Sequence, residues 1–155
     1  MEQATIEALD RIVPMPDQPE RPAGSLEGAQ EQDHFIQRDG VEFAGSHLII
    51  DLWEAKRLDE LDHMEAVLRE AVEVAGATLL HIHLHHFTPS GGISGVAVLA
   101  ESHISVHTWP ERDFAALDVF MCGDARPEMA IPVLRRAFSP GRMEITDLMR
   151  GIVRR

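Results

Sequence analysis

Residues able to carry out nucleophilic chemistry gather between positions 99 and 110 of this 155-residue chain. Ser102 directly follows a carboxylate, Glu101, and His107 lies five positions further on. A serine hydroxyl is a weak nucleophile until a base or strain activates it, and histidine is the usual base. On an ideal strand Ser102 and His107 would face opposite sides, so a bulge, or attack on the backbone, would be needed to use both. The one cysteine, Cys122, comes shortly after, although a lone cysteine is most often a small buried residue.

Histidines form a second candidate site, because six of the nine in the chain lie between positions 81 and 107. Period-two alternation predicts two faces for the strand-like run 80–87: His81, His83 and His85 on one, and Leu80, Ile82 and Leu84 on the other. Alternate imidazoles could bind zinc. No cysteine or glutamate lies on the same strand, so we interpret the run as a polar sheet face and predict no metal site.

Composition narrows the class of protein. Hydrophobic residues make up 45% of the chain, which is typical of a globular protein of one domain. The net charge of −12 argues against a nucleic-acid partner, because binding to phosphates needs Lys and Arg. A single cysteine cannot form an intrachain disulfide, which favours a reducing compartment. With no run of roughly 18 apolar residues and no basic, apolar segment at the start, we expect a cytoplasmic protein that does not bind a membrane.

The elements that must position these residues can be predicted from periodicity. Two helices are expected, one capped by Asp59 and running to Ala75, the other over 127–138, where Pro132 either bends the helix or moves its start. Strand patterns cover six segments: 46–53, 78–87, 93–100, 102–109, 115–122 and 143–148. We write this order as βαβββαβ, and it predicts an α+β fold, a two-layer sandwich whose antiparallel sheet has helices packed on one face.

Residues 1–44 differ from the rest of the chain. They hold ten acidic and three basic residues and four of the nine prolines. Few of their side chains could form a core, so we expect a poorly ordered extension at 1–44 and a folded domain at 45–155.

Three segments carry a resemblance to a known family: Ser94-Gly95, 99–111 and 115–123. Their pattern Glu-Ser-His…His-Thr-Trp-Pro-Glu…Cys-Gly is highly specific and closely resembles the short prokaryotic S-adenosylmethionine decarboxylase proenzymes. The resemblance covers about residues 45–148. It implies that the chain cuts itself between Glu101 and Ser102, and that Ser102 becomes a covalent pyruvoyl group, so that pyridoxal phosphate is not expected.

The resemblance also implies roles for individual residues. By position, His107 matches the proton acceptor and donor of processing, with Ser94 in support. Cys122 matches the proton donor in decarboxylation. Phe87 lies where the family has an aromatic residue that stacks on adenine, and Glu111 where it has a carboxylate that holds the ribose hydroxyls.

The implied reaction converts S-adenosylmethionine, through a Schiff base, to decarboxylated S-adenosylmethionine, the aminopropyl donor for spermidine. Short members of the family are homodimers with active sites near the interface. This sequence departs from the pattern in its long acidic extension, an extra glycine at 91 or 92, and its histidine-rich strand. Two alternatives therefore stay open: an ornithine or arginine decarboxylase on the same scaffold, and a non-catalytic, histidine-rich metal-binding or regulatory module.

Overall fold

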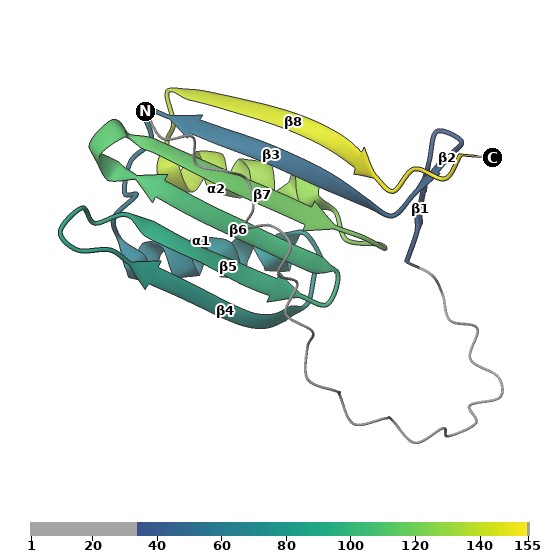
Figure 1. The fold of residues 1–155 in the computed structure, drawn as a ribbon, viewed down its shortest axis with the longest axis horizontal. Coiled ribbons are helices and arrows are strands. Elements are labelled where there is room, and N and C mark those ends of the chain that lie inside the picture. The colour runs from purple at the N-terminus through teal and green to yellow at the C-terminus, as the bar shows by residue number, and fades with distance from the viewer. Residues whose placement is uncertain (1–33, 155) are drawn as a thin grey trace, which may run out of the picture. The chain divides into compact units, whose positions relative to one another are not determined.

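Six antiparallel strands form the central sheet of the computed structural model, which describes residues 34–154 (Figure 1). Across the sheet they follow the order β4-β5-β6-β7-β3-β8. Their bounds are Gly45–Trp53 (β3), Leu79–His86 (β4), Ile93–Leu99 (β5), Ser102–Trp109 (β6), Phe114–Met121 (β7) and Arg142–Arg150 (β8). Each strand lies within two residues of its predicted range, and the α+β class is confirmed. The written order βαβββαβ is wrong by one strand, because β4, β5, β6 and β7 all lie between the two helices.

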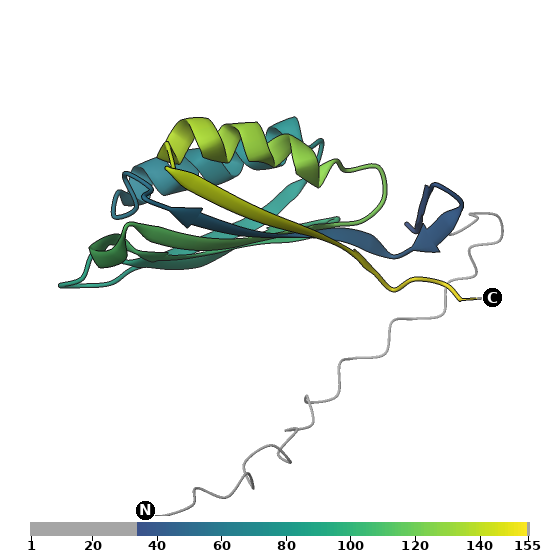
Figure 2. The ribbon, with the colours of Figure 1, turned by 90° about the horizontal axis from the view of Figure 1, so that it is seen from above.

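Both helices lie on the same face of this sheet (Figure 2). Helix α1 spans Leu61–Val74 and α2 spans Ala130–Phe138, preceded by a 3₁₀ turn, η2, over Pro127–Met129. The prediction of Asp59 as the cap of α1 is wrong: Glu60 occupies that position and makes no side-chain capping bond. Pro132 moves the start of the second helix, because it lies in the first turn of α2, where a backbone N–H has no partner to lose. Within residues 34–154, neither helix is long and apolar enough to cross a membrane.

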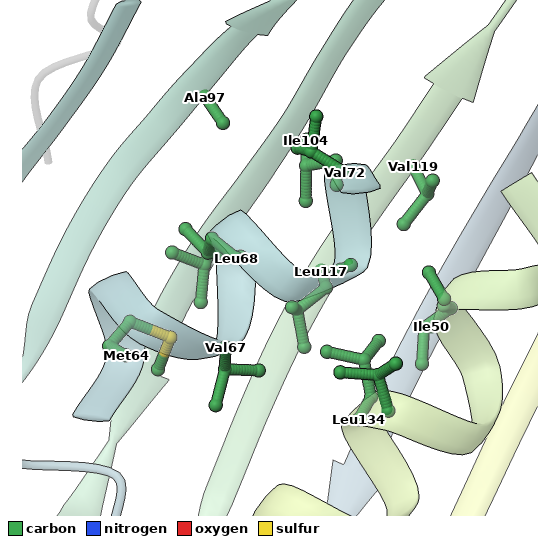
Figure 3. Close-up of a cluster of buried hydrophobic side chains, with 14 of the residues drawn as sticks. Ile50, Met64, Val67, Leu68, Val72, Ala97, Ile104, Leu117, Val119 and Leu134 are labelled. Carbon is green, nitrogen blue, oxygen red and sulfur yellow. The ribbon is translucent and has the colours of Figure 1, made fainter. Parts of the chain in front are cut away.

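The core lies between the helices and the sheet. Every second residue of β3, β6 and β7 is buried, except Ser102 at the start of β6, as the alternating sequence dictates. Figure 3 shows Ile50, Ile104 and Leu117 of the strands meeting side chains of the two helices, and these three residues are at most 1% exposed. Leu68 of α1 and Leu134 of α2 are completely buried.

No helix within the described residues covers the opposite face of the sheet (Figure 2). We call it the open face. Strand alternation assigns to it His47, Ile49 and Asp51 of β3, Ser94, Val96 and Val98 of β5, His103, Ser105 and His107 of β6, and Ala116, Asp118 and Phe120 of β7.

A two-stranded hairpin precedes the central sheet. It pairs β1, Ile36–Arg38, with β2, Val41–Phe43, and the ring of Phe43 is completely buried. Asp39 and Gly40 both have positive φ, as a tight two-residue turn requires. The prediction of a poorly ordered extension to residue 44 is therefore wrong for 36–43. Residues 1–33 lie outside the described part of the chain.

Candidate active site

Ser102 lies directly after a tight hairpin turn. Strands β5 and β6 are joined by two residues, Ala100 and Glu101, and Leu99 pairs with Ser102 across the turn. Two-residue hairpins usually place positive φ on the turn residues themselves. Here the positive φ in the hairpin falls on Ser102, at 150°. A residue with a side chain rarely adopts this conformation, and holding it costs about 1–3 kcal/mol.

The peptide group between Glu101 and Ser102 is held by a neighbouring strand end. The carbonyl oxygen of Glu101 accepts a hydrogen bond of 3.0 Å from the backbone N–H of Cys122, the residue after β7. An N–H aimed at a carbonyl oxygen stabilises the negative charge that develops there when a nucleophile attacks the carbon. Glu101 and Cys122 also line a pocket of about 340 Å³, together with His34, Gly76, Ala100, Gly123, Asp124 and Ala125. We call this region the cleavage end of the sheet.

The opposite end of the same two strands holds a different set of predicted site residues. Ser94 of β5 pairs with His107 of β6, and Ser94 Oγ lies 2.9 Å from His107 Nδ1. Phe87 follows β4 at this end, is 45% exposed, and contacts the ring of His85 edge-on. Glu111 lies in the 3₁₀ turn η1, Pro110–Arg112, which follows β6. We call this region the histidine end.

Within one chain, the cleavage end and the histidine end of the sheet lie far apart. Ser102 and His107 lie five positions apart on one continuous strand, which corresponds to about 17 Å. Strand β6 has no bulge that would bring them closer, because its pairing with β5 and β7 is regular along its length. The sheet's register shift lies in β4 instead, between Leu79 and His81. A general base must approach within about 3 Å of the proton it removes, so His107 cannot act on Ser102 of the same chain in this arrangement.

The histidine-rich strand follows its prediction in part. His81, His83 and His85 pair with Val98, Val96 and Ser94 and share the open face with them. Ile82 and Leu84 pack against the core from the other side, but Leu80 is 63% exposed because the register shift displaces it. The placement of Leu80 on the core face is thus wrong. Among residues 34–154, no three His, Cys, Asp or Glu side chains gather closely enough to hold a metal ion.

A polar network crosses the middle of the open face. Asp118 accepts a hydrogen bond from Ser105 Oγ at 3.0 Å, and its other oxygen lies 2.9 Å from His47 Nε2. Arg150 donates to His47 Nδ1 at 3.0 Å. A guanidinium can only donate, so Nδ1 is the acceptor and Nε2 carries the proton toward Asp118. Sequence reasoning missed this network, because its members come from four different strands.

Glu101 also has a partner that the sequence did not indicate. Thr78, directly before β4, donates to both oxygens of its carboxylate, from the backbone N–H at 2.9 Å and from Oγ1 at 3.1 Å. No motif or spacing marks Thr78, since the contact joins residues 23 positions apart.

Comparisons with known proteins agree on one family. Residues 46–151 match the family model described as S-adenosylmethionine decarboxylase. The S-adenosylmethionine decarboxylase proenzyme of Thermomicrobium roseum is 46% identical over 110 residues, covering 70% of this chain and 95% of that protein. The proenzyme of Methanococcus vannielii is 49% identical over 112 residues, covering 70% and 91%. The crystal structure of the adenosylmethionine decarboxylase from Aquifex aeolicus is similar with a TM-score of 0.67 and 35% identity, covering 72% of this chain and 94% of that one.

Proposed function

The chain belongs to the S-adenosylmethionine decarboxylase family, and on that premise we propose that it becomes an active decarboxylase of S-adenosylmethionine by cutting itself between Glu101 and Ser102. The observation that carries this proposal is the hairpin turn, where a strained Ser102 follows a carbonyl that accepts the N–H of Cys122. The matched proteins give the ornithine or arginine alternative, and the non-catalytic alternative, no support.

Self-cleavage uses only the chain's own atoms and one water molecule. The hydroxyl of Ser102 attacks the carbonyl carbon of Glu101 and loses its proton to a base. The C–N bond breaks, so that an ester joins the two residues and the Ser102 nitrogen becomes a free amine. Removal of the Cα proton of Ser102 then breaks its Cβ–Oγ bond, and Glu101 leaves as a carboxylate. Water replaces the nitrogen, which departs as ammonia, and a pyruvoyl group heads residues 102–155.

The surroundings of Ser102 fit this group. The N–H of Cys122 stands at the carbonyl that must be attacked, and a pocket of about 340 Å³ opens beside Glu101. The group supplies a ketone that condenses with the substrate's amine and accepts the electrons left when CO₂ departs. Cys122, whose backbone N–H contacts Glu101, would return a proton to the product, because a thiol can act as a general acid. Its thiol is free.

A second copy of the chain would complete the site. Three large apolar residues of the open face remain 38–40% exposed, namely Ile49, Val98 and Leu148. Together with the half-buried Phe120, which lies between Val98 and Leu148 in the same row across the sheet, they give the uncovered face apolar surface that a second copy would bury. Consider two such faces packed together and related by a two-fold axis that runs across the strands. The two sheets would lie about 10 Å apart, and the strands of one would run antiparallel to those of the other. The cleavage end of one copy then faces the histidine end of the other.

In such a homodimer each active site draws on both chains. His107, positioned by its 2.9 Å contact with Ser94, would act as proton acceptor and donor for Ser102 of the partner copy. Phe87 would stack on the adenine of the substrate, and Glu111 would accept hydrogen bonds from its ribose hydroxyls. Both residues lie at the histidine end, so the substrate would bind between the two chains.

Intact-mass measurement tests the self-cleavage. Purified protein should contain fragments 1–101 and 102–155, the second without a free amine, while Ser102→Ala should stay whole. An uncut wild-type chain would refute the proposal. The substrate is tested by CO₂ release from S-adenosylmethionine, ornithine and arginine assayed separately, and release from either amino acid without release from S-adenosylmethionine would refute the assignment.

A further inference from the structure

The scissile turn is held on two sides by hydrogen bonds. On one side, Cys122 donates its N–H to the Glu101 carbonyl. On the other, Thr78 makes three contacts with the two residues of the turn. Its N–H and Oγ1 donate to the two carboxylate oxygens of Glu101 at 2.9 and 3.1 Å, and its carbonyl accepts the N–H of Ala100 at 3.0 Å. We call these three contacts the Thr78 clamp.

The scissile turn requires contacts that hold its strained backbone, and the Thr78 clamp provides some of them. A backbone held at φ 150° relaxes unless its surroundings fix it, and the residues on both sides of the strained position must be anchored. Ser102 is anchored by its pairing with Leu99 and Met121 within the sheet. Glu101 lies outside any strand, so its orientation depends on its own hydrogen bonds. The Thr78 clamp supplies bonds to its side chain and to its neighbour Ala100.

We propose that Thr78 is a positioning residue for self-cleavage: by holding the Glu101 carboxylate, it keeps the scissile carbonyl on the N–H of Cys122 and within reach of the Ser102 hydroxyl. The inference rests on the proposed function, since it concerns the same bond. It adds a residue that directly precedes β4, acts through Glu101 and has no hydrogen bond to Ser102 or to the Glu101 carbonyl. Attack on a carbonyl depends steeply on orientation, so a looser turn should cut more slowly without folding less well.

Thr78 is exposed, which separates this role from a general contribution to stability. Exposed hydrogen bonds add little to the free energy of folding, because water replaces either partner. A variant without the hydroxyl should therefore keep its thermal midpoint. Thr78→Val retains the backbone N–H and the branched shape and removes only the contact of Oγ1. Thr78→Ser retains the hydroxyl.

The test follows cleavage of newly made full-length chains. Wild type, Thr78→Val and Thr78→Ser are synthesised in a cell-free system, and the uncut fraction is followed by denaturing gel and intact mass. Because the rate of attack depends steeply on the orientation of the reacting groups, we expect a cleavage rate roughly five- to tenfold lower for Thr78→Val. Thr78→Ser should cleave at the wild-type rate. Glu101→Ala, which removes the carboxylate that Thr78 holds, should also slow cleavage, whereas Glu65→Ala, which breaks an exposed pair with Arg69 on α1, should not.

Two further measurements show whether a variant cleaves slowly because its turn is misplaced or because its fold is less stable. In the uncleavable Ser102→Ala background, adding Thr78→Val should leave the thermal midpoint unchanged; a large drop would show a structural role and overturn the proposal. The double variant Thr78→Val with Glu101→Ala should be no slower than Glu101→Ala alone, because Thr78 Oγ1 then has no carboxylate to hold. Additive effects, or a Thr78→Val chain that cleaves as fast as wild type, would also overturn it. A wild-type chain that never cleaves would instead refute the proposed function itself.

Discussion

Two inactive variants should restore cleavage to each other if each site uses two chains. Ser102→Ala lacks the nucleophile, and His107→Ala lacks the base, so neither should cut itself when expressed alone. In a mixed dimer, one site pairs the intact Ser102 of the His107→Ala chain with the intact His107 of the Ser102→Ala chain. The other site carries both lesions. Co-expression should therefore produce cleavage of the His107→Ala chain only.

The separation of the two residues sets this expectation. About 17 Å of regular strand lies between Ser102 and His107 of one chain, whereas proton transfer needs an approach of about 3 Å. No side-chain rotation closes such a gap, because a histidine side chain reaches only a few ångströms from its backbone. With equal expression and random pairing, about half of the dimers are mixed, so about half of the His107→Ala chains should be cut.

Intact mass distinguishes the products when the two variants carry tags of different mass. The chains must be co-expressed, so that mixed dimers form as the chains fold. The control is the pair Ser102→Ala with Ser102→Ala/His107→Ala, which should yield no fragment. Cleavage of His107→Ala expressed alone, at the wild-type rate, would refute the role of His107. Absence of cleavage in the mixed preparation, with mixed dimers shown to be present, would refute the two-chain site.

Two other substitutions probe the site and the core. Cys122→Ala keeps the backbone N–H that contacts Glu101, so this variant should cleave itself normally. Its rate of CO₂ release should fall roughly 10²- to 10⁴-fold, which is the usual contribution of a proton donor. Normal CO₂ release would show that the thiol is not the proton donor. Leu68→Ala should lower the free energy of unfolding by about 2–5 kcal/mol, because Leu68 is completely buried. Leu80→Ala, at a position that is 63% exposed, should lower it by less than about 1 kcal/mol. Denaturant unfolding of both variants in the Ser102→Ala background measures the difference, and equal losses would contradict the assigned core.

Local sequence patterns were enough to predict the strands of the central sheet. The turn between β5 and β6 then determines which site residues face each other. The two strands around Ala100 and Glu101 were predicted as 93–100 and 102–109. A two-residue turn between them determines the register, which places Ser94 opposite His107. Period-two alternation likewise predicted that Ser102 and His107 belong to different faces. The register keeps this mismatch, because Ser102 pairs with the buried residues Leu99 and Met121, whereas His107 pairs with Ser94 of the open face.

Features that depend on distant parts of the chain were missed for different physical reasons. The contact of Thr78 with Glu101 joins the start of one strand to a turn between two others, and no local periodicity records it. Leu80 is exposed and lies outside the core because of a register shift in β4 that the alternating sequence does not reveal. The hairpin at 36–43 did have a local signal, Asp39-Gly40 between strand-like residues, but the acidic, proline-containing composition around it outweighed that signal.

If His107 is the base, its position explains how a strained turn can persist in a folded chain. Strain at Ser102 and the N–H on the Glu101 carbonyl both favour attack, and both are present within one chain. His107, the residue proposed as the proton acceptor, lies at the far end of the strand from Ser102 of the same chain. If a second copy supplies that acceptor, folding can prepare the bond without breaking it. Cleavage is then coupled to assembly, so that the pyruvoyl group forms only where the partner's Phe87 and Glu111 are already present to bind the substrate.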